Sequence, residues 1–167
     1  MGKAVSDILL LGDNRLYEIC QPIYRSENIL LTEIITELHN VLIEFRAKYG
    51  FGRAIAAPQL GYLKRVIYMN IQNKPTVFIN PEITFKSPEK FEVWDDCMSF
   101  PNLLVRLHRH KSIRIKFWDE SWQEQELFLE DDLSELLQHE YDHLDGILCP
   151  MRAIDSKSFK WRTFENQ

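Results

Sequence analysis

The stretch from Glu135 to Gly146, "ELLQHEYDHLDG", predicts a helix that carries two potential metal ligands. It places His139 and His143 four residues apart, with Glu140 directly after the first histidine. Residues four apart share one face of an α-helix, so the two imidazoles can converge on one point. Glu140 is displaced by about 100° around the helix, too far to be a third ligand but close enough to reach a water on a metal. This is the HExxH arrangement of two ligands and a general base.

The residues around this stretch predict where its helix begins and ends. Asp132 is a candidate N-cap, and Glu135 three residues later is close to a capping box. Gly146 stands where a C-terminal glycine is expected. The alternative is a chance match, in which two solvated histidines flank an acidic residue.

A catalytic zinc-type site needs a third protein ligand and keeps one position for water. Downstream of the helix there is no histidine, and the candidates are Cys149, Asp155 and Glu165. Cys149 lies in the apolar "GILCPM", a context typical of an inert buried thiol. Cys97 lies in the polar, turn-like "VWDDCMSFP" and is a better candidate than Cys20 in "YEICQPI". Spacing favours Cys97 without excluding the others.

The rest of the chain predicts an α+β fold. Residues 27–50, "ENILLTEIITELHNVLIEFRAKYG", have apolar side chains at helical spacing, and Gly50 is a plausible stop. The later runs "RVIYMNI", "TVFIN", "SIRIKFW" and "QELFLE" are short and rich in β-branched and aromatic residues, as strands are. We expect prolines to break the runs, at Pro75, Pro81, Pro88 and Pro101. Helix, several strands and helix, in that order, indicate the α+β class.

Composition indicates one ordinary globular domain spanning residues 1–167, in a reducing cytoplasm. Apolar residues make up 45% and charged residues 27%. The net charge of −5 argues against a general nucleic-acid binder, although the basic cluster "RLHRHK" (106–111) could contact ribosomal RNA if it is not simply a solvated strand and turn. No apolar run approaches the ~20 residues that span a bilayer, and the N-terminus is a poor signal peptide. Three cysteines do not form a disulfide framework.

Three motifs together resemble the peptide deformylase family. "HEYDHLDG" is similar to its HExDH motif, "DDCMS" (95–99) to EGCLS, and "GRAIAAPQLG" (52–61) to GxGxAAPQxG. They occur in the family's order and at compatible spacing, and the resemblance runs from about Leu9 to about Ile154. It implies short antiparallel or mixed sheets packed around a central C-terminal HExxH helix.

The resemblance implies removal of the N-formyl group from the formyl-methionine of newly made proteins. The implied metal ligands are Cys97, His139 and His143, with water as the fourth. A thiolate and two imidazoles suit zinc, iron or nickel better than magnesium or calcium. The family likeness favours Fe²⁺ in the cell, with Zn²⁺ or Ni²⁺ as alternatives. The implied partners are formyl-methionyl nascent peptides, with transient ribosome contact, and no membrane or specific nucleic acid is expected.

The resemblance also implies catalytic roles for three residues. Glu140 takes the proton of the attacking water and later delivers it to the leaving amine. The side-chain amide of Gln59 and the backbone N–H of Met98 stabilise the oxygen that gains negative charge. Gln59 must be a neutral donor, because a carboxylate would repel that charge.

Several positions depart from the family pattern, and they fall on the substrate side of the site. Arg53 replaces an aliphatic residue, Ala54 replaces the second glycine of its motif, and Asp95-Asp96 replaces Glu-Gly. Gly52, Arg53, Ala54 and Asp96 are the candidate substrate-binding residues. A side chain at Asp96 is expected to crowd the strand edge that pairs with the peptide.

Two pairings have open alternatives. Asp95 can pair with Arg109, or Arg109 can pair elsewhere on the surface. Glu135 can fold back to the backbone N–H of Asp132, leaving the pocket for the methionine side chain apolar. Alternatively it faces that pocket and pairs with a cation such as Arg53, which makes the pocket polar.

Three functional hypotheses follow. The first is a metal-dependent deformylase of formyl-methionyl peptides. The second is a related metallohydrolase that cleaves another N-acyl peptide or an internal peptide bond. The third is a deformylase-like binding protein with little turnover.

Overall fold

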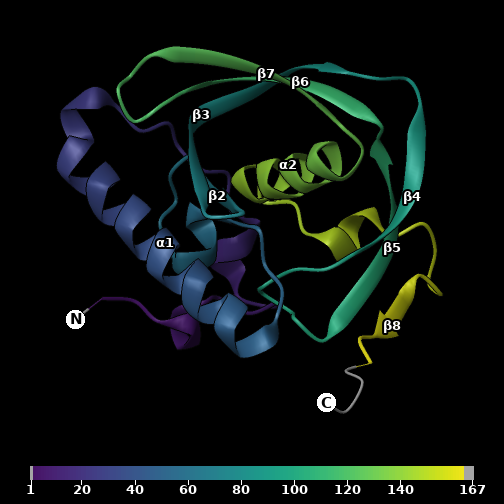
Figure 1. Ribbon diagram of the computed structural model, residues 1–167. Helices are drawn as coiled ribbons and strands as arrows, with labels where there is room; N and C mark the ends of the chain where they lie inside the picture. Colours follow the sequence, from purple (N-terminus) through teal and green to yellow (C-terminus); the bar gives the residue numbers. More distant parts are fainter. Residues whose placement is uncertain (1, 164–167) are drawn as a thin grey trace.

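In residues 2–163, which the computed structural model describes, the chain forms two α-helices and eight strands joined by turns and short 3-10 helices (Figure 1). The elements are α1 (Asn28–Tyr49), β1 (Ala54–Ala56), β2 (Val66–Ile71), β3 (Lys74–Lys86), β4 (Lys90–Asp95), β5 (Leu103–His110), β6 (Ser112–Trp118), β7 (Glu124–Glu130), α2 (Asp131–Leu144) and β8 (Phe159–Trp161). The predicted α+β class is confirmed. Neither α-helix is long and apolar enough to cross a membrane, within the residues described.

The strands form two antiparallel sheets around α2. One sheet has the order β1-β2-β3-β6-β7 and the other β4-β5-β8. Figure 1 shows α2 in the middle, with strands around it, while α1 packs on the outside. Helix α2 contacts β1 and β7 of the first sheet and β5 of the second, so it joins the two sheets.

The four runs predicted as strands correspond to β2, β3, β6 and β7, but two of the prolines do not break them. Pro75 and Pro81 both lie inside β3, so the prediction that they interrupt strands is wrong. Pro81 lies where the pairing of β3 with β6 shifts register, between Ile79 and Glu82. A proline lacks the backbone N–H of a regular ladder, and such an irregularity accommodates it.

The strands β1, β4 and β8 were not predicted from the sequence, and β5 was anticipated only in part, as the strand-and-turn alternative for residues 106–111. The prolines predicted to separate strands at Pro88 and Pro101 do lie outside them, before β4 and β5 respectively. In β5, "LLVRLHRH", charged and histidine side chains alternate with apolar ones. That alternation suits an antiparallel strand with one buried face, but the arginines and histidines make the segment resemble a solvated loop.

Helix α1 forms as its apolar spacing predicts. Its buried face consists of Leu31, Ile34, Leu38, Val41, Leu42 and Phe45. It ends at Gly50, whose φ of 78° is left-handed and whose N–H bonds to the carbonyl of Arg46.

Helix α2 begins two residues earlier than the capping prediction required. Its N-cap is Glu130, and no side chain caps it, so the assignment of Asp132 as N-cap is wrong. The Asp132 carboxylate lies 3.0 Å from Arg53 Nη1, and this ion pair replaces a local bond to the helix backbone. Gly146 follows the helix with a φ of 69°, as expected for a terminal glycine.

Substituting Gly146 tests the close contact between the end of α2 and the N-terminal segment. A Cβ there would lie 2.4 Å from the carbonyl oxygen of Tyr17, whereas at Gly50 it would meet nothing within 4 Å. Both residues have positive φ, so Gly50→Ala is a matched control for backbone strain, about 1–2 kcal/mol. We expect Gly146→Ala to lower the free energy of unfolding by about 1–3 kcal/mol more, measured by urea denaturation. Equal losses in the two variants would contradict the contact.

Candidate metal centre and active site

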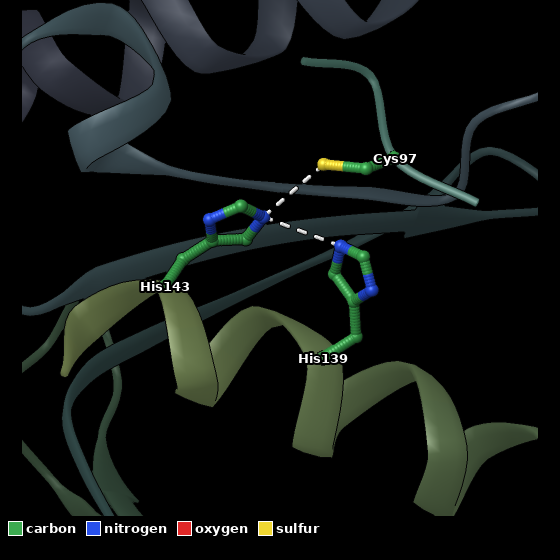
Figure 2. A group of neighbouring side chains, drawn as sticks. All are labelled: Cys97, His139 and His143. Atoms are coloured by element: carbon green, nitrogen blue, oxygen red, sulfur yellow. Dashed lines mark hydrogen bonds between the residues drawn. The ribbon is translucent and has the colours of Figure 1, made fainter. Parts of the chain in front are cut away.

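Two histidines from α2 and one cysteine from the turn after β4 converge in the interior (Figure 2). His139 Nε2 and His143 Nε2 are 3.2 Å apart, and Cys97 Sγ lies 3.3 Å from His143 Nε2. All three residues are buried, and one ligand atom from each lies within 4.8 Å of the others. The structure therefore brings together the three residues predicted as ligands, across 42 positions of the chain between Cys97 and His139.

The spacing of these atoms fits a tetrahedral metal ion. With metal–nitrogen bonds of about 2.0–2.1 Å and metal–sulfur bonds of about 2.3 Å, nitrogens are about 3.3 Å apart and nitrogen and sulfur about 3.6 Å apart. Burial and the charge of the neighbouring His139 hold the pKa of His143 well below its usual range. The Asp95 carboxylate raises the pKa of His139 against the effect of burial, and a bound metal ion requires both rings to be neutral. The donor set suits a divalent transition metal.

Cys149 lies on the other edge of the His139 ring. Its Sγ is 3.2 Å from His139 Nδ1, and Asp95 Oδ1 is 3.0 Å from the same nitrogen. Burial raises the pKa of the Cys149 thiol to about 12, although the neighbouring His139 opposes this. Asp95, His139 and Cys149 form a second cluster of potential ligands. Their contacts at Nδ1 orient the His139 ring and leave its Nε2 directed at Cys97 and His143. Cys20 and Asp155 are in neither cluster, and Glu165 lies outside the described residues.

Asp95 connects His139 to a buried chain of charges. Its second oxygen lies 2.9 Å from Arg109 Nη2, and Arg109 Nη1 lies 2.6 Å from Asp142. Burial alone would raise the pKa of Asp95, but the charges of His139 and Arg109 lower it below its usual range. Arg109 therefore pairs with Asp95, one of the two alternatives considered from the sequence. Arg152 closes the chain with two hydrogen bonds to Asp142.

This chain of charges also changes the interpretation of the basic cluster "RLHRHK". Arg109 is 3% exposed and cannot contact RNA, while Lys111 pairs with Glu89 and Arg106 with Asp155. The cluster is a strand whose charges face different surroundings. Sequence reasoning missed Asp142 and Arg152, although the position of Asp142 directly before His143 was a signal.

Glu140 is buried and has an unsatisfied oxygen. It is 4% exposed, and in the described part of the chain its Oε2 has no hydrogen-bond partner. Burial raises the pKa of its carboxyl to about 7. A carboxyl group with this pKa can accept and return a proton near neutral pH.

Gln59 presents the donor side of its amide toward Cys97. It lies in a short 3-10 helix, Ala57–Leu60. Its Oε1 accepts a bond of 2.9 Å from Ala56 N, which leaves Nε2 to donate to Ser99 Oγ at 3.1 Å and to lie 3.5 Å from Cys97 Sγ. The bond at Ala56 fixes the amide orientation, and the contribution of Ser99 was missed from the sequence.

A cavity of about 340 Å³ lies beside the group formed by Cys97, His139 and His143, called the metal cluster below. Its lining includes Cys97 and His139, two of the three predicted ligands, together with Glu140 and Met98. All four predicted substrate-binding residues also line it: Gly52, Arg53, Ala54 and Asp96. The remaining lining residues are Arg46, Gly50, Phe51, Asp95, Glu135 and Leu136.

Glu135 faces this cavity and does not cap the helix. Its Oε2 lies 3.4 Å from Arg53 Nη2, so the capping alternative is wrong and the pairing alternative holds. Burial and the negative charge of Asp95 raise the pKa of Glu135 to about 7, although Arg53 opposes this. Arg53 and Glu135 therefore make one wall of the cavity polar.

Asp96 forms an ion pair with the C-terminal segment. Its carboxylate accepts a hydrogen bond from Arg162, which also stacks over the ring of Phe51 at 3.9 Å. Arg162 follows β8, and sequence reasoning did not single it out. The segment after β8 thus contacts two residues that line the cavity.

Comparisons with known proteins agree on one family. A family model described as "Polypeptide deformylase" matches residues 5–159. A peptide deformylase of Pseudothermotoga lettingae is 35% identical over 158 residues, covering 95% of this chain and 88% of that protein. The structure of a peptide deformylase from Synechococcus elongatus in complex with actinonin matches with a TM-score of 0.81 and 26% identity, over 89% of this chain and 79% of the other. A Met-Ala-Ser-bound class I type b peptide deformylase from Acinetobacter baumannii matches with a TM-score of 0.79 and 26% identity, over 87% and 96% of the two chains.

Replacing Asp95 tests whether the buried charge chain supports the metal centre. We expect Asp95→Asn to weaken metal affinity by about 10–100-fold, because the asparagine no longer fixes the His139 ring through a charged acceptor. Asp96→Asn is the matched control, since Asp96 is adjacent but has no contact with His139 among those described. Competition with a chromogenic chelator measures both. Equal affinities in the two variants would show that Asp95 does not act through His139.

Proposed function

This chain belongs to the polypeptide deformylase family, and we propose that it is a metal-dependent hydrolase that removes the N-formyl group from the formyl-methionine of newly made proteins. The family model matches nearly the whole chain, and the relatives are named peptide deformylases. The observation that carries the proposal is the convergence of His139, His143 and Cys97 beside the buried Glu140.

In this proposal Cys97, His139 and His143 hold one divalent metal ion. The separations between their ligand atoms and the soft donor set support the assignment. Fe²⁺ is the proposed ion in the cell, with Zn²⁺ or Ni²⁺ as alternatives. When bound, the ion acts as a Lewis acid toward water and the formyl oxygen.

Glu140 is the proposed general base and acid. Its unpaired Oε2 can accept a proton from the attacking water and pass it to the leaving amine. The formyl carbon becomes tetrahedral as its bond to water forms, and the C–N bond then breaks to give formate and a free amino terminus. Burial excludes competing solvent around the carboxyl group.

Gln59 and Met98 are the proposed donors to the developing oxyanion. Gln59 Nε2 faces the metal cluster because its Oε1 is held by the backbone N–H of Ala56. Met98 directly follows Cys97, and its backbone N–H is the second proposed donor. Donors held in advance of the reaction stabilise charge without reorganising.

Substrate and location follow from the same proposal. The substrates are formyl-methionyl nascent peptides, which the enzyme would meet in the cytoplasm, in transient contact with the ribosome. Gly52, Arg53, Ala54 and Asp96 are the proposed peptide-binding residues, and all line the cavity beside the metal cluster.

The direct test is an anaerobic assay of iron-loaded protein. We expect formate release from formyl-Met-Ala-Ser, with release of acetate from acetyl-Met-Ala-Ser at least about 100-fold slower, because one added methyl group must fit beside the ligands. Absence of formate from protein with full metal content would refute the proposed function. Cleavage of internal peptide bonds in an unfolded protein would indicate the endopeptidase alternative.

Replacing Glu140 tests its proposed role as the base. We expect Glu140→Gln to retain metal, because the side chain is not among the converging ligand atoms, and to lose about 10²–10⁴-fold in kcat. Metal content by mass spectrometry and turnover of formyl-Met-Ala-Ser are measured on the same preparation. A kcat close to that of the unmodified protein would assign the proton transfer to another group.

A further inference from the structure

We propose that Glu135 and Arg53 shift the selectivity of this enzyme for the first residue of its peptide, away from apolar side chains and toward unbranched side chains that end in an N–H donor. The inference rests on the proposed function and deepens it, because it concerns the cavity beside the same metal cluster. The position, pairing and charge of these two residues support it.

The first side chain of a formyl peptide must enter the described cavity. The formyl carbon is bonded to the nitrogen of the first residue, and the side chain begins only three bonds from that carbon. The reacting group has to lie against Cys97, His139 and Glu140, all of which line the cavity. A side chain attached so close to the reaction therefore extends into the same space.

Glu135 forms part of the wall of this cavity. It lies four residues before His139, on the same face of α2. Its side chain is 15% exposed, and it contributes to the cavity lining together with Arg53, which directly precedes β1. The wall thus contains an ion pair at a position where apolar side chains would suit a thioether.

Arg53 compensates Glu135 only in part. Its Nη1 lies 3.0 Å from Asp132, whereas its Nη2 lies 3.4 Å from Glu135, at the long end of hydrogen bonding. Asp132 is 75% exposed and does not belong to the cavity lining. The guanidinium is therefore drawn toward the solvent side, and the Glu135 carboxylate is left able to accept a further hydrogen bond.

The rest of the wall suits an unbranched stem. Leu136 and Met98 line the cavity with apolar atoms and can pack against methylene groups. Glutamine has nearly the length of methionine and the same absence of branching, but its amide can donate to Glu135. Methionine offers only a weakly accepting sulfur. Its side chain would displace water from the Glu135 carboxyl group without replacing the hydrogen bonds that the water made.

The test compares formyl-Met-Ala-Ser with formyl-Gln-Ala-Ser on metal-loaded enzyme. The readout is the ratio of kcat/KM for methionine over glutamine, which cancels losses common to both substrates. We expect the unmodified enzyme to give a lower ratio than its Glu135 variants, because the glutamine amide can donate to the Glu135 carboxyl group. In Glu135→Leu the ratio should rise about 10- to 100-fold, the range for a hydrogen bond to a charged group. Arg53 keeps Asp132 as its partner in that variant.

Two further variants make the result decisive. Glu135→Gln retains the shape of the side chain and should raise the ratio in the same direction by a smaller factor, even if Glu135→Leu folds poorly. Asp131→Asn removes a neighbouring exposed carboxylate at the start of α2 that does not line the cavity and has no contact with Arg53 among those described, so it should leave the ratio within about twofold. An unchanged ratio in both Glu135 variants, or an equal change in Asp131→Asn, would overturn the proposal.

A binding measurement separates this inference from the proposed function. If the unmodified enzyme releases no formate from either peptide, the proposed function fails, and calorimetric affinities for formyl-Met-Ala-Ser and formyl-Gln-Ala-Ser, which stay intact in that case, decide the inference. Affinities that favour glutamine in the unmodified enzyme and methionine in Glu135→Leu support it. The same preference in both proteins overturns it.

Discussion

The fold depends on burying a helix that carries polar side chains. Most of α2 lies in the interior, including Ser134, Gln138, His139, Glu140 and His143. Buried polar groups are costly unless they find partners. The strands around α2 supply them: Gln138 accepts from the backbone N–H of His110 and donates to its carbonyl, and Ser134 donates to the same carbonyl. The side chains of α2 and the backbone of β5 thus satisfy each other's hydrogen bonds close to the predicted metal ligands.

The need of buried polar groups for partners also explains the chain of charges next to His139. His139 is held by Asp95, Asp95 by Arg109, and Arg109 by Asp142, which returns to α2. The chain of contacts links the end of β4, the end of β5 and the helix. A buried pair of this kind contributes little net stability, but breaking it leaves an uncompensated charge. Its consequence here is geometric, because it holds the His139 ring with Nε2 toward Cys97.

The sequence predicts the elements that depend on local spacing and misses what depends on distant partners. The i, i+4 pair His139 and His143 and the apolar face of α1 could be predicted because neighbours on one helix decide them. The polar surroundings of Cys97 favoured it over Cys149, but local spacing could not predict that the two thiols contact different histidines, Cys97 next to His143 and Cys149 next to His139. The capping prediction failed because Arg53, far away in the chain, attracts Asp132 and Glu135. Arg162 was missed for the same reason.

X-ray absorption spectroscopy of the zinc-loaded protein tests the central claim most directly, because it counts sulfur and nitrogen neighbours of the metal. Cys97, His139 and His143 as ligands require one sulfur at about 2.3 Å and two imidazole nitrogens at about 2.0–2.1 Å, with a single additional light atom. Two sulfur neighbours would mean that Cys149 also binds the metal. No sulfur neighbour would mean that Cys97 is not a ligand, and the account of the site would be wrong.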